Sequence, residues 1–297
     1  MRPTHAAYEG ATHAAYEGAT HAAYAGTAHS VNPGLAHGTS PGVAHDTYAG
    51  AAVPLLAGLP APALADFDRI AVHGTFRREV PVFVEGEDGD CVFLILRGKV
   101  KVTRPGPEGK DVLFTMVGPG QLLGELCVFD GGPRHSTATA VQETDLCWIP
   151  VPAMRGWLAR HPEASLRMMH LLATRIRNVN DRLEDVTGVD VATRVARALV
   201  EQASRFGRRT PLGLRFSLDL SQDELARHVR ASRERVNQVL MDFSRRGWLL
   251  REGNEWIVLD PPGLTRRARY RPETASRRPS ITTTRAPGGA WALMRRS

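Results

Sequence analysis

The residues from Gly124 to Thr139 combine side-chain types that can hold a small anion. Gly124 opens a stretch expected to form a short helical turn, whose backbone N–H groups could point at a ligand. Glu125 supplies a carboxylate that can accept hydrogen bonds from a sugar hydroxyl. Asp-Gly-Gly-Pro predicts a turn at 130–133, after which Arg134 presents a guanidinium suited to bidentate phosphate contact.

A second stretch, from Ser221 to Leu240, has the pattern of a helix-turn-helix. Ser221 and Glu224 form a capping box that begins a first helix. Ala231–Ser232 begins a second helix, which is expected to bury Val236, Val239 and Leu240. The alternating segments 247–251 and 255–259 predict the hairpin of a winged version.

Early residues of the second helix of such a motif meet base edges in the major groove. Arginine can bridge guanine O6 and N7, glutamate can accept from cytosine N4, and glutamine can pair with adenine. The predicted DNA-binding residues are Ser221, Gln222, Ser232, Arg233, Glu234, Asn237 and Gln238.

The segment 69–150 must position the anion-binding stretch. It consists of short apolar runs separated by glycine-containing turns, which predicts an all-β roll or barrel. The runs expected to be strands are 80–84, 91–96, 99–103, 111–115 and 145–149.

Residues 152–188 are expected to be helical, and Pro162 suits a first helical turn. Beyond Met169, apolar residues recur at alternating steps of three and four, as in a heptad seam. Such a seam could be intramolecular core or a dimer interface, and its position between two compact regions favours a dimer. The predicted dimerisation residues are Leu172, Ile176, Val179, Leu183 and Val186.

The two ends of the chain differ in composition from the middle. Residues 4–51 are an eight-residue repeat, with His at 5, 13, 21, 29, 37 and 45. They contain too few aliphatic side chains to offset ordering entropy, so a disordered low-complexity region is expected. Metal binding by the histidines, or a true start further downstream, are alternatives. Residues 264–297 contain nine arginines against Glu273 alone, which predicts a disordered basic tail, either solvated or adding nonspecific DNA affinity.

Composition narrows the class of protein. The net charge of +7 favours an anionic partner, although much of it lies in the tail. Cys91, Cys127 and Cys147 show no CxxC spacing, which argues against disulfides or zinc and fits a reducing compartment. No apolar run is long enough to span a bilayer and no signal-peptide layout is present, so a cytoplasmic location without membrane attachment is expected.

Residues 65–262 resemble the Crp/Fnr family, the cyclic AMP receptor protein regulators. The resemblance rests on Gly124-Glu-Leu with Phe129-Asp-Gly-Gly-Pro-Arg134, and on Leu225-Ala with Ala231-Ser-Arg-Glu-Arg-Val236. It implies a cyclic-nucleotide-binding β-roll, a long dimerisation helix and a C-terminal winged helix. It also implies a homodimer that binds a palindromic operator in double-stranded DNA and contacts RNA polymerase. No cofactor is required, and cAMP or another cyclic nucleotide is the implied allosteric effector.

By position, the resemblance places Glu125 on the ribose 2′-hydroxyl and Arg134 on the cyclic phosphate. The implied ligand-binding residues are Gly124, Glu125, Leu126, Arg134, His135, Ser136 and Asn180. The chain departs from cAMP-binding relatives at His135, where Ser or Thr is usual, and at Val179, which cannot bond the adenine amino group. In the helix-turn-helix, Gln238 replaces a usual basic residue and Arg230 a common turn glycine.

Together these observations predict an α+β chain of five parts: a disordered repeat (1–60), a cyclic-nucleotide-binding-like β-roll, jelly-roll-like in type (61–160), a dimerisation helix (161–188), a winged helix-turn-helix (189–263) and a disordered tail (264–297). The predicted function is a sequence-specific DNA-binding regulator controlled by a cyclic nucleotide, and not an enzyme. The alternative is a ligand-independent regulator with a decayed pocket. A metal-dependent jelly-roll enzyme has little support, because only His73 and His135 lie in the roll.

Overall fold

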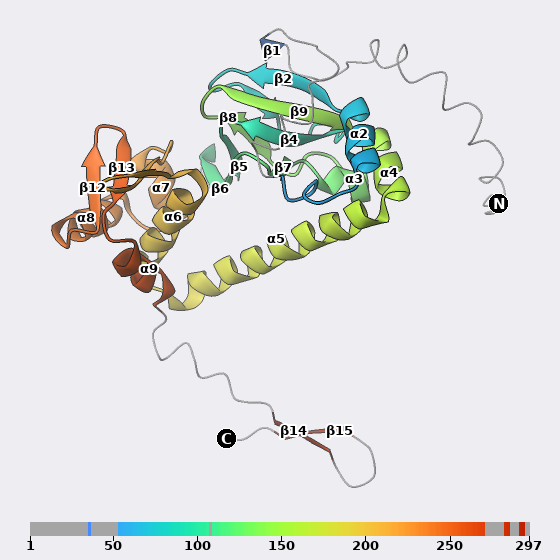
Figure 1. Cartoon of the computed structure of the whole chain (residues 1–297). Coiled ribbons are helices and arrows are strands. Elements are labelled where there is room, and N and C mark those ends of the chain that lie inside the picture. The colour runs from blue at the N-terminus through green and yellow to red at the C-terminus, as the bar shows by residue number, and fades with distance from the viewer. Residues whose placement is uncertain (1–34, 37–52, 107–108, 271–281, 286–290, 295–297) are drawn as a thin grey trace, which may run out of the picture.

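The structure, a computed structural model, describes residues 35–36, 53–106, 109–270, 282–285 and 291–294 (Figure 1). The predictions of disorder for the repeat up to residue 52 and for the tail beyond residue 270 fall mostly outside the described residues. The described part contains a β-roll, a long helix and a C-terminal winged helix-turn-helix, which confirms the predicted α+β fold class.

Two antiparallel sheets form the β-roll. One sheet has the strand order β1-β2-β9-β4-β7 and the other β3-β8-β5-β6. The strands are β1 (Leu35–Ala36), β2 (Val72–Phe76), β3 (Pro81–Phe83), β4 (Cys91–Arg97), β5 (Val100–Pro105), β6 (Asp111–Val117), β7 (Leu122–Leu123), β8 (Thr137–Ala140) and β9 (Thr144–Pro150). All five strands expected from the sequence occur, with bounds shifted by up to two residues.

Two apolar clusters hold the roll together. The cluster that contains Phe76, Phe93 and Ile95 joins residues of both sheets. In the other, strand residues pack against the helices α2 (Ala61–Ile70) and α4 (Val151–Arg160), with Phe67 and Trp157 in edge-to-face contact. Residues 53–60 belong to this cluster, since Leu55 and Leu59 are buried. The predicted disorder up to residue 60 is therefore wrong for its last eight residues, which hold the aliphatic side chains that the repeat lacks.

The helical segment after β9 is divided in two. α4 ends at Arg160, and α5 (Pro162–Gly188) begins at Pro162, which is the expected first-turn position. His161 between them is outside the helical region, with φ −125° and ψ 80°, because a following proline disfavours helical backbone. In Figure 1, α5 runs from the roll to the C-terminal domain as a single long helix.

The C-terminal domain has a core of its own, which includes Leu199, Phe216, Val236 and Phe243. Its elements are α6 (Val191–Phe206), β10 (Arg208–Thr210), β11 (Gly213–Ser217), α7 (Gln222–His228), α8 (Arg233–Arg245), β12 (Leu249–Glu252), β13 (Glu255–Val258) and α9 (Pro261–Arg269). The capping box of Ser221 and Glu224 is present, which confirms the predicted start of the first helix. Beyond this domain, β14 (Thr282–Arg285) pairs with β15 (Trp291–Met294).

Helix α9 extends past the predicted boundary at residue 263. Asp260 caps it, and Leu264 and Ala268 are buried against the domain core. The prediction that the disordered tail begins at residue 264 is therefore wrong for this first segment. Two apolar side chains spaced four residues apart lie on one helix face, and their burial outweighs the basic composition.

Candidate ligand pocket and nucleic-acid interface

A cavity of about 380 Å³ lies between the roll and α5. Six of the seven predicted ligand-binding residues line it, namely Gly124, Glu125, Leu126, Arg134, His135 and Ser136. Asn180 is exposed on α5 and is not among the lining residues, whereas Val179 is. Successive helical residues point about 100° apart, and the lining pair on this turn is Asn178 and Val179, so Asn180 is turned past the cavity.

Arg134 is buried, with only 5% of its surface exposed, and its recorded ion pair, with Asp90, is a long one. Its guanidinium lies 3.4 Å from the carbonyl oxygen of Gly124 and 3.4 Å from a carboxylate oxygen of Asp90. It also stacks on the ring of Phe83, 4.5 Å from the centroid, and its Nε has no hydrogen-bond partner in the structure. Buried charges are normally paired at short range, so this guanidinium has unused capacity for an anion.

Glu125 follows β7, lines the same cavity as Arg134 and is 5% exposed. It is ion-paired with Arg175 of α5, which also donates to the carbonyl oxygen of Leu122. Sequence reasoning missed Arg175. The signal was available, because Arg175 lies four residues before Val179 and therefore on the same helix face.

The short helix α3 (Leu126–Asp130) lies between Glu125 and Arg134 in the chain. We call the stretch from Gly124 to Arg134 the cassette. Gly124 has a φ of 69°, and a Cβ there would lie 2.3 Å from Nη1 of Arg134, so only glycine fits. At the other end of α3, Arg155 of α4 donates to the carbonyl oxygens of Val128 (2.5 Å) and Cys127 (3.1 Å). The contact with Val128 satisfies a carbonyl near the helix end, whereas the Cys127 carbonyl also accepts from the Gly131 N–H.

Two of the three thiols lie beside this cassette. Burial raises the pKa of the Cys127 thiol, although Arg134 opposes the shift. Burial and the neighbouring carboxylate of Asp90 raise the pKa of Cys91 to about 12. Both thiols are therefore protonated at neutral pH and act as small apolar groups rather than as nucleophiles.

The predicted dimerisation face of α5 carries exposed apolar side chains. Met169, Ile176 and Val179 are 54%, 61% and 54% exposed, and Leu172 is half-buried. Leu166 extends this row and is 65% exposed. The side chains of Leu183 and Val186 lie outside the described residues.

The recognition helix α8 is exposed at its N-terminal end. Ser232 caps the helix, and Ser232, Arg233, Glu234 and Gln238 are exposed, while Asn237 is half-buried. Hydrogen bonds from its own backbone N–H and the Ser232 hydroxyl lower the pKa of the Glu234 carboxyl, so it is ionised and can only accept.

Gln222 of α7 links the two helices of the motif. Its side-chain oxygen accepts hydrogen bonds from Arg233 Nε at 3.3 Å and from Asn237 Nδ2 at 3.2 Å. Ser221 is exposed at the start of α7. The predicted DNA-binding residues of α7 and α8 are thus brought together at one edge of the domain.

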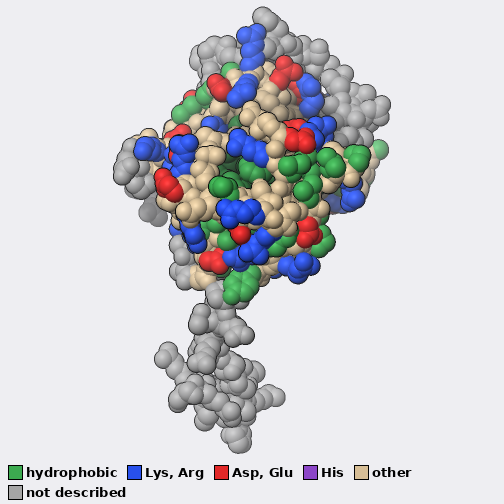
Figure 2. Space-filling view, turned by 90° about the vertical axis from the view of Figure 1, so that its left-hand side faces the viewer, with side chains coloured by type: hydrophobic (Ala, Val, Ile, Leu, Met, Phe, Trp, Pro, Cys, Tyr) green, Lys and Arg blue, Asp and Glu red, His purple; other side chains and the backbone are tan. Residues whose placement is uncertain are grey.

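The surface around α8 is basic. Figure 2 views the molecule from the side of α8 and the β12–β13 hairpin and shows more Lys and Arg than Asp and Glu side chains on this face. The exposed arginines of the motif and hairpin are Arg230, Arg233, Arg235, Arg245, Arg246 and Arg251. Such a face suits the phosphate backbone of DNA.

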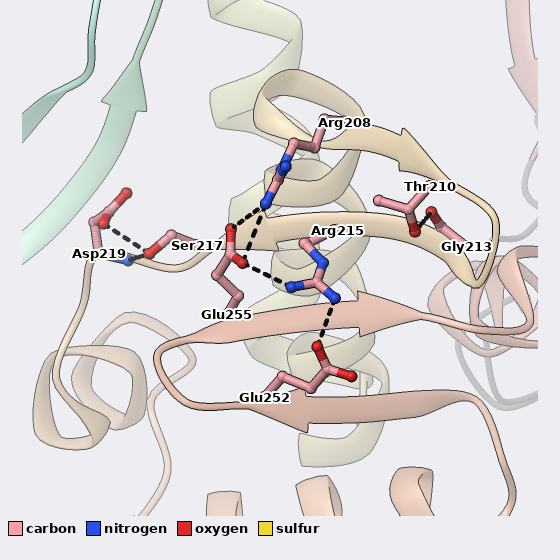
Figure 3. A network of polar contacts seen from close by, with 8 residues as sticks. All are labelled: Arg208, Thr210, Gly213, Arg215, Ser217, Asp219, Glu252 and Glu255. Carbon is pink, nitrogen blue, oxygen red and sulfur yellow. Dashed lines mark hydrogen bonds and ion pairs between the residues drawn. The ribbon is translucent and has the colours of Figure 1, made fainter.

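Acidic residues at the hairpin are neutralised within the domain. Arg215 contacts Glu255 at 3.0 Å and Glu252 at 2.5 Å, and Arg208 contacts Glu255 at 3.3 Å (Figure 3). The hydrogen bond from Arg215 is the main reason that the pKa of Glu255 is lowered. This pairing leaves Arg251 as an exposed cation of the wing.

No group of three or more His, Cys, Asp or Glu side chains in the described part of the chain is arranged to hold a metal ion. None of the helices described has the length and apolar character needed to cross a membrane.

The roll with its charged cavity, joined by a long helix to a winged helix-turn-helix, defines the class of ligand-binding DNA regulators. Family models agree: residues 74–161 match the cyclic nucleotide-binding domain and residues 193–267 match the Crp-like helix-turn-helix domain.

Relatives match over more than half of the chain. The chain is 44% identical over 194 residues to the CRP-like cAMP-activated global transcriptional regulator of Mycobacterium tuberculosis, covering 65% of this chain and 87% of the relative. It is 30% identical to the cyclic AMP receptor protein of Thermus thermophilus, covering 56% and 74%. A solved CRP-family regulator from Thermus thermophilus superposes with a TM-score of 0.55 at 27% identity, over 65% and 95% of the two chains. The chain belongs to the Crp/Fnr family of transcriptional regulators.

Proposed function

We propose that a cyclic nucleotide, with cAMP as the first candidate, binds between Glu125 and Arg134 and sets the affinity of the protein for its operator. The observation that carries this proposal is the buried Arg134, whose contacts are long and whose Nε is unpartnered. A cyclic phosphate would supply the short charge-assisted bonds that the guanidinium lacks. The name of the mycobacterial relative, a cAMP-activated regulator, supports the choice of ligand.

Glu125 is assigned to the ribose 2′-hydroxyl. Its carboxylate is held in place by Arg175, so a sugar hydroxyl could donate to it without further ordering of the side chain. Because Arg175 lies on α5, a ligand that contacts Glu125 would also affect the long helix through the Glu125–Arg175 ion pair. Arg205 of α6, on the far side of the interdomain connection, lines the same cavity. Both contacts offer routes from the ligand to the DNA-binding domain.

The acting form is proposed to be a homodimer. Exposed apolar side chains along α5 would be buried by a second copy, which the heptad spacing favours. Two recognition helices related by a two-fold axis would then contact a palindromic operator. Contact with RNA polymerase and a cytoplasmic location remain predictions.

Calorimetric titration with cAMP and with cGMP, followed by operator binding with and without each nucleotide, tests the proposal. Binding of ligand and of DNA must tighten each other by the same factor. Absence of nucleotide uptake at millimolar concentration would rule out cyclic-nucleotide control. That result would favour the ligand-independent alternative, in which His135 and the apolar Val179 mark a pocket no longer used.

A further inference from the structure

The β5–β6 hairpin has contacts on two sides. Val102 of β5 and Met116 and Val117 of β6 line the ligand cavity. Lys99 and Lys101 alternate with Val100 and Val102 and therefore point to the opposite face. That opposite face meets the DNA-binding domain of the same chain.

Lys99 anchors the contact. It is only 4% exposed, and its ammonium lies 2.5 Å from Oδ2 of Asp219 and 3.0 Å from the carbonyl oxygen of Ser217. The ammonium also lies 4.2 Å from the ring centroid of Phe206. A lysine this buried requires a charged partner, and Asp219, in the segment that leads into α7, supplies it.

The local backbone is adapted to this pair. Asp219 has a φ of 50°, a conformation that non-glycine residues seldom adopt. The Ser217 hydroxyl donates to its other carboxylate oxygen at 2.7 Å, as Figure 3 shows. The segment between β11 and α7 is thus held in an uncommon conformation that aims the carboxylate at the roll.

Further bonds place α7 against the roll. Lys101 pairs with Glu224 at 3.1 Å, Arg227 donates to the carbonyl oxygen of Asp111 at 3.0 Å, and His228 contacts that of Leu113 at 3.1 Å. The carbonyl oxygen of Met116, a residue of the cavity wall, accepts from Arg205 at 2.9 Å. The same β6 strand therefore touches the ligand cavity and the first helix of the DNA-binding motif.

This arrangement restricts access to the start of α7. Ser221 and Gln222, predicted to contact DNA, line a second cavity of about 380 Å³ whose opposite wall includes Arg78 and Lys101 of the roll. That volume suits a small molecule, for which ~300–1,000 Å³ is usual. The roll therefore forms one wall of the space that a DNA duplex would have to enter to contact Gln222.

We infer that Lys99 and Asp219 form an interdomain latch, which holds the DNA-binding domain against its own roll and lowers DNA affinity. A ligand that displaces β6 from inside the cavity would open the latch. The ligand part of this inference rests on the proposed function, whereas the latch itself does not require a nucleotide.

Asp219→Asn is the test variant, because asparagine tolerates a positive φ but cannot pair with the ammonium. Glu143→Gln is the matched control, since it removes an exposed ion pair with Arg97 within the roll. Lys99→Met is the second variant and removes the latch from the other side. Without nucleotide, operator affinity should rise at least ~10-fold in both latch variants, which corresponds to about 1.4 kcal/mol, and should stay unchanged in the control.

Amide hydrogen exchange of the full-length, nucleotide-free protein checks the latch directly. Exchange in α7 and β6 should accelerate in Asp219→Asn and not in Glu143→Gln. Faster exchange with unchanged DNA affinity, or unchanged exchange in both latch variants, would overturn the inference. Tighter DNA binding by the variants, in a protein that takes up no cyclic nucleotide, would support the latch and contradict only the proposed ligand.

Discussion

Replacing Arg134 with methionine separates ligand binding from stability more sharply than any other single change. In the nucleotide-free protein, the guanidinium makes two bonds of 3.4 Å, stacks on Phe83 and leaves Nε unpartnered. Hydrogen bonds to a charged group contribute ~1.5–3 kcal/mol each. A bidentate phosphate contact therefore contributes at least ~3 kcal/mol, even at the low end of that range.

That free energy corresponds to a loss of about 100-fold in cAMP affinity, since 1.4 kcal/mol is tenfold. Stability should respond differently. The unsatisfied buried Nε of Arg134 costs ~1–3 kcal/mol of stability, and the methionine variant removes this cost. That gain offsets the loss of the cation–π contact with Phe83, which contributes ~0.5–2 kcal/mol. The methionine sulfur can contact the rings of Phe83 and Phe93. The free energy of unfolding should therefore change by no more than about 1 kcal/mol, or rise.

Isothermal calorimetry with cAMP and urea unfolding of the nucleotide-free protein measure the two quantities. Arg104→Met is the control. Arg104 lies on β5, pairs with Glu85 and is not among the residues that line the cavity. An Arg134 variant that binds cAMP within threefold of the parent would show that the phosphate lies elsewhere. A loss of stability above ~3 kcal/mol would show instead that the Arg134 guanidinium stabilises the fold through its pair with Asp90. Removing one partner of a buried ion pair has a cost of that size.

Other perturbations test the remaining parts of the molecule. Arg233→Ala should lose ~1–3 kcal/mol of specific DNA binding per half-site with the dimer retained, and an unchanged footprint would contradict its role. Ile176→Asp should convert the proposed dimer to a monomer in sedimentation, because it places a charge in the apolar row of α5; a stable dimer would refute that interface. Burial alone would raise the pKa of the Asp190 carboxyl, but hydrogen bonds from Arg267 and Thr193 lower it on balance. Its pairing with Arg267 therefore stabilises the fold above the unfolded pKa of ~3.9 and is lost as pH falls through the lower folded value. Asp190→Asn should cost about 0.5 kcal/mol at pH 7, given the exposure of the pair, and the difference should vanish in urea unfolding at acid pH. Arg230→Gly should raise the free energy of unfolding by ~0.5–1 kcal/mol, because a φ of 50° strains a residue with a Cβ; a loss of stability would show that the side chain matters more.

Local patterns were sufficient for much of this protein. The capping box at Ser221, the helix start at Pro162 and the alternating strands of the roll follow from interactions between residues close in the chain. The cassette from Gly124 to Arg134 is similarly local, since one turn brings its two ends together. For this reason, the fold class and six of the residues that line the cavity were predictable from sequence alone.

Only the tertiary structure decided which distant residues join these local units. Arg175 reaches Glu125 across 50 positions, and Lys99 reaches Asp219 across 120. The spacing of Arg175 from Val179 places it on the cavity face of α5 but does not identify Glu125 as its partner. Lys99 has no such signal, because a lysine on a strand usually faces solvent. Helix α9 was missed for the opposite reason: its basic composition indicated a tail, and only the burial of Leu264 and Ala268 against α6 and its neighbours made it part of the domain. Sequence determines the local elements through short-range sterics and hydrogen bonds, whereas the pairing of isolated charges depends on how those elements pack.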